Sequence, residues 1–194
     1  MRSLLLSIAI ATALLCSTVT AAPPKSASAP ESWSCSFAIY NNPEECRPPR
    51  PMKFDLESTM SLGTHVTPGD KGCVSNKDRP RYYPSMAPIT CSDERGFVYT
   101  ASDDGIIGEI SLNSGASDDA GFMEMRLALD RKYGPPTLVM RPLRDAKWES
   151  TDGAMLDVIR DDNGNTKIIV SSSQGRADAA RRYQLGYEKL HRDY

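Results

Sequence analysis

The most regular hydrophobic pattern in the chain lies between positions 117 and 137. Phe122, Met125, Leu129 and Tyr133 recur at helical spacing, so they form one apolar stripe along a single face. Charged and small residues occupy most of the positions between them. The pattern predicts an amphipathic helix that packs its stripe against the rest of the fold.

Both ends of this helix carry recognisable signals. Ser117 is expected to cap the N-terminus, and Asp118 and Asp119 place negative charge near the free N–H groups of the first turn. Gly134 is expected to end the helix in the left-handed conformation, because the two prolines that follow it prevent continuation.

Short strands are predicted on both sides of this helix, where apolar and polar positions alternate or apolar residues run together. They are expected at 35–40, 54–62, 97–100, 106–112, 137–140, 147–151, 154–160 and 166–171. Two turn signals, Asp103-Asp104-Gly105 and Asp152-Gly153, predict hairpins, because glycine supplies the positive φ that tight turns need.

A terminal helix is predicted over residues 176–194. Its apolar stripe consists of Ala180, Tyr183, Tyr187, Leu190 and Tyr194. Strand pairs, a helix, a meander and a final helix together predict an α+β fold. We expect an antiparallel meander sheet with a packed central helix and a C-terminal helix, and an N-terminal half stapled by disulfides.

The N-terminal residues 1–21 have the pattern of a secretory signal peptide. Arg2 precedes the apolar run Leu4–Leu15, and small residues at positions 19 and 21 place the cleavage before Ala22. Cys16 offers a lipoprotein alternative, although Leu15 is large for a lipid-attachment site. Residues 22–33 are rich in Pro, Ala and Ser and predict a flexible leader, so residues 34–194 are expected to form a single domain in the periplasm or outside the cell.

Charge excludes some classes of partner. The formal net charge is −2 over 194 residues, so the chain lacks the excess of positive charge that is typical of nucleic-acid-binding proteins. No stretch after the leader is apolar enough to predict a membrane span.

Four cysteines follow the expected cleavage site: Cys35, Cys46, Cys73 and Cys91. An even number in a secreted chain predicts two disulfides, for which three pairings exist. We favour Cys35–Cys46 and Cys73–Cys91, because short loops close most readily. A zinc site would need closely paired cysteines or neighbouring histidines, which are lacking, and no cofactor is expected.

The segment between Cys73 and Cys91 is the candidate binding site. It is stiffened by prolines, lacks a helix or strand period, and gathers cations and aromatic rings that are common in binding hot spots. The residues expected to contact a partner are Lys77, Arg79, Arg81, Tyr82, Tyr83 and Met86. The alternative is that Tyr82 and Tyr83 merely cover the core.

Two catalytic or metal sites can be drawn but lack supporting motifs. His65 lies near Asp70 and several serines, yet no Gly-x-Ser-x-Gly elbow is present. The Asp161–Asn165 segment is spaced like part of a calcium loop, but the acidic ligand expected later in the loop is missing. A hairpin turn is the favoured interpretation of that segment.

A short motif resembles a module of small bacterial secreted and periplasmic proteins. It consists of Leu129–Pro136, which includes Lys-Tyr-Gly-Pro, followed by Trp148 and the Asp152-Gly153 turn. The arrangement is similar to the helix-plus-sheet unit of the β-lactamase-inhibitor-protein-like fold and covers roughly residues 97–172. The resemblance implies an inhibitor or immunity protein and supplies no catalytic residues.

The sequence therefore predicts a secreted or periplasmic, non-catalytic module that binds a protein partner in the envelope or outside the cell. The alternatives are an envelope hydrolase that uses carboxylates with His65, and a structural envelope protein. A binding protein needs only a surface that covers its partner, whereas a hydrolase needs a catalytic constellation.

Overall fold

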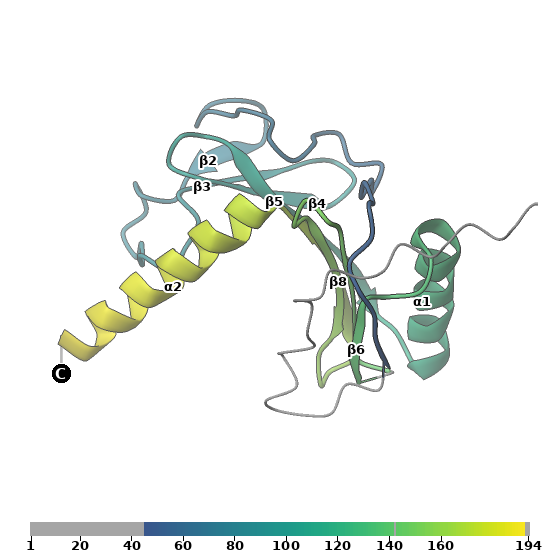
Figure 1. Cartoon of the computed structure of the whole chain (residues 1–194). Helices are drawn as coiled ribbons and strands as arrows, with labels where there is room; N and C mark the ends of the chain where they lie inside the picture. Colours follow the sequence, from purple (N-terminus) through teal and green to yellow (C-terminus); the bar gives the residue numbers. More distant parts are fainter. Residues whose placement is uncertain (1–44, 142, 193–194) are drawn as a thin grey trace, which may run out of the picture. The chain divides into compact units, whose positions relative to one another are not determined.

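The computed structural model describes residues 45–141 and 143–192. All of them belong to the second of the two units into which the chain separates, residues 33–194. The signal peptide, the leader and the strand expected at 35–40 lie outside the described residues. Figure 1 shows that helix α1 (Asp119–Tyr133) lies beside β6 and β8, whereas helix α2 (Ser173–Arg192) begins near β5.

A single antiparallel sheet dominates the described part of the chain. Its order is β1-β6-β7-β8-β9-β5-β4-β3-β2, and every neighbouring pair is antiparallel. The strands are β1 (Glu45–Cys46), β2 (Cys73–Ser75), β3 (Ile89–Ser92), β4 (Phe97–Ala101), β5 (Ile107–Ala116), β6 (Leu138–Arg141), β7 (Asp145–Glu149), β8 (Met155–Arg160) and β9 (Asn165–Ser171). Two meanders, β2–β5 and β6–β9, are thus joined through the β5–β9 pair. Sheet and helices together make a mixed α+β fold.

The two predicted hairpin turns are confirmed. Gly105 has φ of 76° between β4 and β5, and Gly153 has φ of 80° between β7 and β8. Strands β2 and β3 were not predicted, because three or four residues are too few to show a period.

The core consists of two clusters on the sheet. The first lies on β2–β5 and includes Tyr99 and Ile107, both fully buried. The second lies between α1 and β6–β9 and includes Phe122 and Trp148, which are also fully buried. The predicted stripe of α1 packs against this second cluster, so the predicted orientation of α1 is confirmed.

Ser117 was predicted as the N-cap of α1, but the N-cap is Asp118. The Asp118 side chain accepts a hydrogen bond from the Gly121 amide at 2.8 Å. Ser117 still belongs to the end of the sheet, since its amide donates to the Gly164 carbonyl and its hydroxyl contacts that of Thr166. The helix can therefore begin only one residue later.

Gly134 ends α1 with a positive φ, but not in the left-handed helical conformation that was predicted. Its φ of 77° and ψ of 179° fall in a region that only glycine readily occupies. The Arg50 side chain accounts for this backbone conformation of Gly134. It donates to the Tyr133 and Pro135 carbonyls and fills the space beside Gly134.

We predict that Gly134→Val lowers the free energy of unfolding by about 1–3 kcal/mol. A side chain would be forced into this backbone conformation, and its Cβ would lie 2.8 Å from an Arg50 nitrogen. Urea denaturation provides the measurement. Gly115→Val is the control for the clash alone: Gly115 also has a positive φ (81°) but no neighbour within 4 Å, so this variant should lose only the part of the stability that comes from backbone strain. An unchanged midpoint for Gly134→Val would contradict the conformation.

Residues 51–63, here called the strap, were predicted as a strand over 54–62 but are not one. The predicted alternation is nevertheless present in the burial of the strap. Phe54, Leu56, Met60 and Leu62 are half-buried against the core clusters, and the residues at positions 55, 57, 59 and 61 are exposed. The strap therefore packs its side chains on the core instead of pairing with a sheet edge.

Two buried or half-buried tyrosines satisfy the strap's backbone in place of a neighbouring strand. The Tyr133 hydroxyl donates to the Asp55 carbonyl and accepts from the Asp55 amide, at 2.6 and 3.1 Å. The Tyr99 hydroxyl accepts from the Thr59 amide at 3.2 Å. These tyrosines hold the strap at two points, with Glu57 between them at a φ of 57°.

Candidate partner-binding surface

The loop between β2 and β3, residues 76–88, is closed at its base by the predicted disulfide. Cys73 and Cys91 face each other across the two strands and are bonded, so this pairing is confirmed. Cys46 is also disulfide-bonded. The predicted Cys35–Cys46 pairing stays a prediction, because Cys35 lies outside the described residues.

Asn76 joins the two ends of the loop by hydrogen bonds, in addition to the disulfide. This role was not predicted from the sequence. Its side-chain amide donates to the Ala87 carbonyl and to the Thr90 hydroxyl, both at 2.7 Å. Its backbone amide donates to the Pro88 carbonyl at 2.8 Å. Asn76 is only 3% exposed, so these bonds are shielded from water. Its place three residues after Cys73, which was itself expected to form a disulfide, is the one signal in the sequence that could have indicated this role.

The six predicted contact residues lie along this one loop. Consecutive tight turns shape it, since the amides of Arg79, Tyr82 and Met86 each donate to the carbonyl three residues before. Of the six, Lys77, Arg79, Arg81 and Tyr83 are exposed, and Tyr82 and Met86 are half-buried. The loop therefore presents cations and one aromatic ring, while Tyr82 and Met86 also contact the fold.

Two neighbours outside the loop hold its side chains. Lys77 forms an ion pair with Asp103 of the β4–β5 turn, and the hydrogen bond from this pair raises the pKa of Lys77. The ammonium of Lys189 in α2 lies 5.5 Å from the centre of the Tyr83 ring, within the range of a cation–π contact. The β4–β5 turn and α2 thus flank the loop.

Two glycines let helix α2 approach the fold closely, and Arg176, Asp178 and Arg182 of the same helix are half-buried. At its N-terminal end, Gly175 approaches Gly108 of β5 so closely that a Cβ on either residue would clash with backbone atoms of the other. Further along, Gly186 is buried against Ser85 of the loop. The predicted stripe faces away from the core, which the sequence pattern did not indicate: Tyr183 is 72% exposed.

The residues of the hydrolase alternative do not form a triad with each other. His65 is exposed, and its backbone pairs with Ile106 in an isolated bridge. The Asp70 carboxylate accepts a hydrogen bond from the Thr67 amide at 2.7 Å, so it is used to stabilise a local turn.

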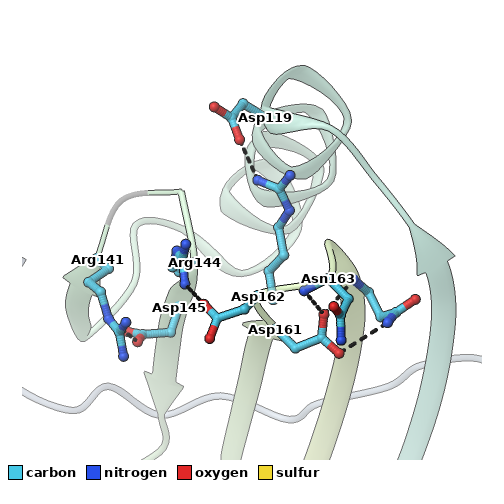
Figure 2. Close-up of polar contacts among 9 residues, drawn as sticks. Asp119, Arg141, Arg144, Asp145, Asp161, Asp162 and Asn163 are labelled. Atoms are coloured by element: carbon cyan, nitrogen blue, oxygen red, sulfur yellow. Dashed lines mark hydrogen bonds and ion pairs between the residues drawn. The ribbon is translucent and has the colours of Figure 1, made fainter.

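The calcium-like segment is an ordinary turn between β8 and β9. Figure 2 shows the Asp161 carboxylate turned toward Asn163; it accepts hydrogen bonds from the amides of Asn163 and Asn165. The side chain of Asn165 also donates to it, and these bonds lower the pKa of Asp161. Asp162 pairs with Arg144 instead. Within 45–141 and 143–192, no three His, Cys, Asp or Glu side chains are grouped to hold a metal ion.

A cavity of about 290 Å³ lies between the strap and the sheet. Its polar lining comes from Lys53, Asp55, two serines and Asp152, and its apolar floor includes Ile110 and Val170. Neither histidine nor cysteine is among the described residues that line it. The cavity is thus a gap beneath the strap with mixed polarity.

We predict that stability in acid depends on Asp93, which accepts hydrogen bonds from Tyr99 and Thr59 and thereby secures the strap. Desolvation alone would raise the pKa of Asp93, but these bonds and two from backbone amides outweigh it and lower the pKa below the ordinary value of an aspartate. A depressed folded pKa stabilises the fold above the unfolded pKa, and this contribution is lost as pH falls through the folded pKa. Urea midpoints should therefore fall less between pH 5 and pH 2 in Asp93→Asn than in the wild type. Identical pH profiles would contradict the contact.

No helix among the described residues is long and apolar enough to cross a membrane. Comparison with known proteins finds no matching family model, no matching curated protein and no matching solved structure. The functional argument therefore depends on the residues of this chain alone.

Proposed function

We propose that this chain is a secreted or periplasmic protein that binds a partner protein through the loop Lys77–Met86. An inhibitor or immunity protein that masks an enzyme or toxin is the most concrete form, as the resemblance of the Lys-Tyr-Gly-Pro motif implies. The disulfide supports the location, because disulfides persist in oxidising compartments.

The observation that carries the proposal is the combination of a closed base with an exposed tip. The disulfide and Asn76 fix both ends of the loop, while Arg79, Arg81 and Tyr83 remain exposed. A loop that is ordered before binding loses less conformational entropy when a partner holds it. Arginine and tyrosine are also the residues that most often carry the energy of an interface.

Charge indicates the kind of surface that the loop fits. Lys77 is already paired with Asp103, but the exposed Arg79 and Arg81 still outnumber Asp78 in the loop, although the whole chain has a formal charge of −2. Complementary potentials accelerate association and select partners. We infer that the partner presents an acidic surface to the loop.

The test is a parallel capture from envelope extract of the producing cells with three forms of the mature protein as bait. We expect the wild type and Lys71→Ala to retain the same partner, and Arg81→Ala/Tyr83→Ala to lose it. Each loop substitution should weaken binding by about 1–3 kcal/mol. Lys71 is a suitable control because it is a fully exposed cation outside the loop, paired only with the exposed Glu94. A partner retained equally by all three baits would remove the loop from the interface.

A further inference from the structure

The cavity beneath the strap lies where the two core clusters meet. Its floor includes Ile110 and Val170, which face each other across strands β5 and β9 and are both buried. Ile110 belongs to the first core cluster and Val170 to the second. Leu56 and Leu62 of the strap contact both clusters and line the cavity from the other side. The interior of the cavity is therefore largely aliphatic.

Hydrogen bonds hold the strap in place over this floor. The Ser150 hydroxyl donates to the Met52 carbonyl at 2.8 Å and accepts from the Met52 amide at 3.1 Å. Together with the bonds that Tyr133 and Tyr99 make to the strap, this contact fixes the strap backbone at three points along its length. Protein interiors are normally close-packed, and a strap that was free to move inward would close the gap. The three anchors therefore account for the open cavity.

Small side chains leave this space unfilled. Ser58 and Ser61 of the strap line the cavity, as does Ala154, the residue directly before β8. Ala154 lies on the same face of the sheet as the buried Leu156, because alternate residues of a strand share a face. The cavity measures about 290 Å³, whereas a cavity of about 150 Å³ is enough to hold benzene. It can therefore take the apolar part of a small molecule.

Three charged side chains line the cavity, and only one of them lacks a partner among the described residues. The Asp55 carboxylate accepts a hydrogen bond from the Glu57 amide at 2.7 Å, and that of Asp152 accepts one from the Ala154 amide at 2.9 Å. The Lys53 ammonium makes no hydrogen bond or ion pair within the described part of the chain, and its side chain is exposed. A ligand that buries an apolar body under the strap can thus place an anionic head against Lys53.

We propose that this cavity binds a small amphipathic carboxylate, whose hydrocarbon body lies between the strap and the Ile110–Val170 floor and whose carboxylate lies beside Lys53. Burial of the apolar body supplies most of the affinity. The contact with Lys53 is solvent-exposed and therefore weaker, and it selects the charge of the head. The site shares no residue with the loop of residues 76–88, so it is independent of the proposed protein partner.

The experiment is an NMR titration of the mature, disulfide-intact protein, labelled at Ile, Leu and Val methyl groups, with octanoate at neutral pH. We expect saturable shifts of the Ile110 and Val170 methyl signals. Octylamine, which has the same chain length and the opposite charge, should bind more weakly, and acetate, which has the head alone, should not shift these signals. Octylamine that binds as tightly as octanoate, or shifts confined to the exposed Leu185 and Leu190 of α2, would overturn the proposal.

Two variants test the body and the rim of the site separately. Ala154→Leu should fill the cavity and abolish the octanoate-induced shifts without lowering the melting temperature. Lys53→Met changes only an exposed side chain and should weaken octanoate binding about threefold to fivefold, without weakening that of octylamine. Lys71→Met is the matched control and should bind octanoate like the wild type, because Lys71 is an exposed cation that does not line the cavity. Unchanged octanoate binding in Lys53→Met, or in a folded Ala154→Leu protein, would contradict the proposed site.

Discussion

Trp148→Ala is expected to lower the free energy of unfolding by about 3–5 kcal/mol. Trp148 is fully buried between α1 and the sheet, and its indole nitrogen donates to the Gly134 carbonyl at 2.8 Å. Truncation would open a cavity in the second core cluster and remove the donor to the end of α1. Urea denaturation followed by circular dichroism gives the measurement.

Ile159→Ala is the control for this substitution. Ile159 lies in the adjacent strand β8, but its side chain is 40% exposed on the other face of the sheet. Its truncation should change stability by only about 0.5 kcal/mol. A Trp148→Ala protein as stable as Ile159→Ala would show that the indole does not lie in the core.

Removal of the loop disulfide is the second large effect. The double variant Cys73→Ala/Cys91→Ala should lose about 3 kcal/mol of stability, as the chain-entropy model gives for a loop of this size. The two cysteines are 18 residues apart, and their bond is the covalent part of the loop base. Replacing both avoids leaving a free thiol that could form mixed disulfides.

Thermal unfolding of the double variant under non-reducing conditions measures this loss. The wild type in the presence of reductant should melt at or below the temperature of the double variant, because reductant also breaks the disulfide of Cys46. Wild-type stability in the double variant would show that Asn76, through its bonds to Ala87 and Thr90, closes the loop without the disulfide.

The local elements of the fold could be predicted because their causes are local. Helix α1 was located from a stripe of four residues, and the β4–β5 and β7–β8 turns from glycines that adopt positive φ. The N-cap was placed one residue early because Ser117 and Asp118 are both good caps. Only the contacts of Ser117 with Gly164 and Thr166, distant in sequence, decide between them.

The strap and α2 show the limits of a burial pattern. Period two in the strap predicted a strand, which is wrong. The same period appears in the structure as alternating burial, and alternation does not distinguish a strand from an extended segment that packs side chains on a core. The terminal stripe correctly predicted a helix, but periodicity does not say what an apolar face meets. Gly175 and Gly186 decide the seating of α2, because only glycine permits their close approach to Gly108 and Ser85.

The candidate site was located only in part. Arg81, Tyr83 and their neighbours were proposed from composition and from the cysteines that flank them, and their role in binding stays a prediction. Asn76 and Lys189 were missed, because their contacts join residues that are distant in the sequence or belong to different elements. A side chain that closes a loop has no period and no motif of its own.

Hydrogen–deuterium exchange on the purified complex tests the central claim most directly, because it reports the partner's footprint on the unmodified protein. We predict new protection in residues 76–88, centred on Arg81 and Tyr83, with little change on the strap. Protection confined to residues 51–63 and the cavity beneath them, with the loop exchanging as in the free protein, would contradict the account.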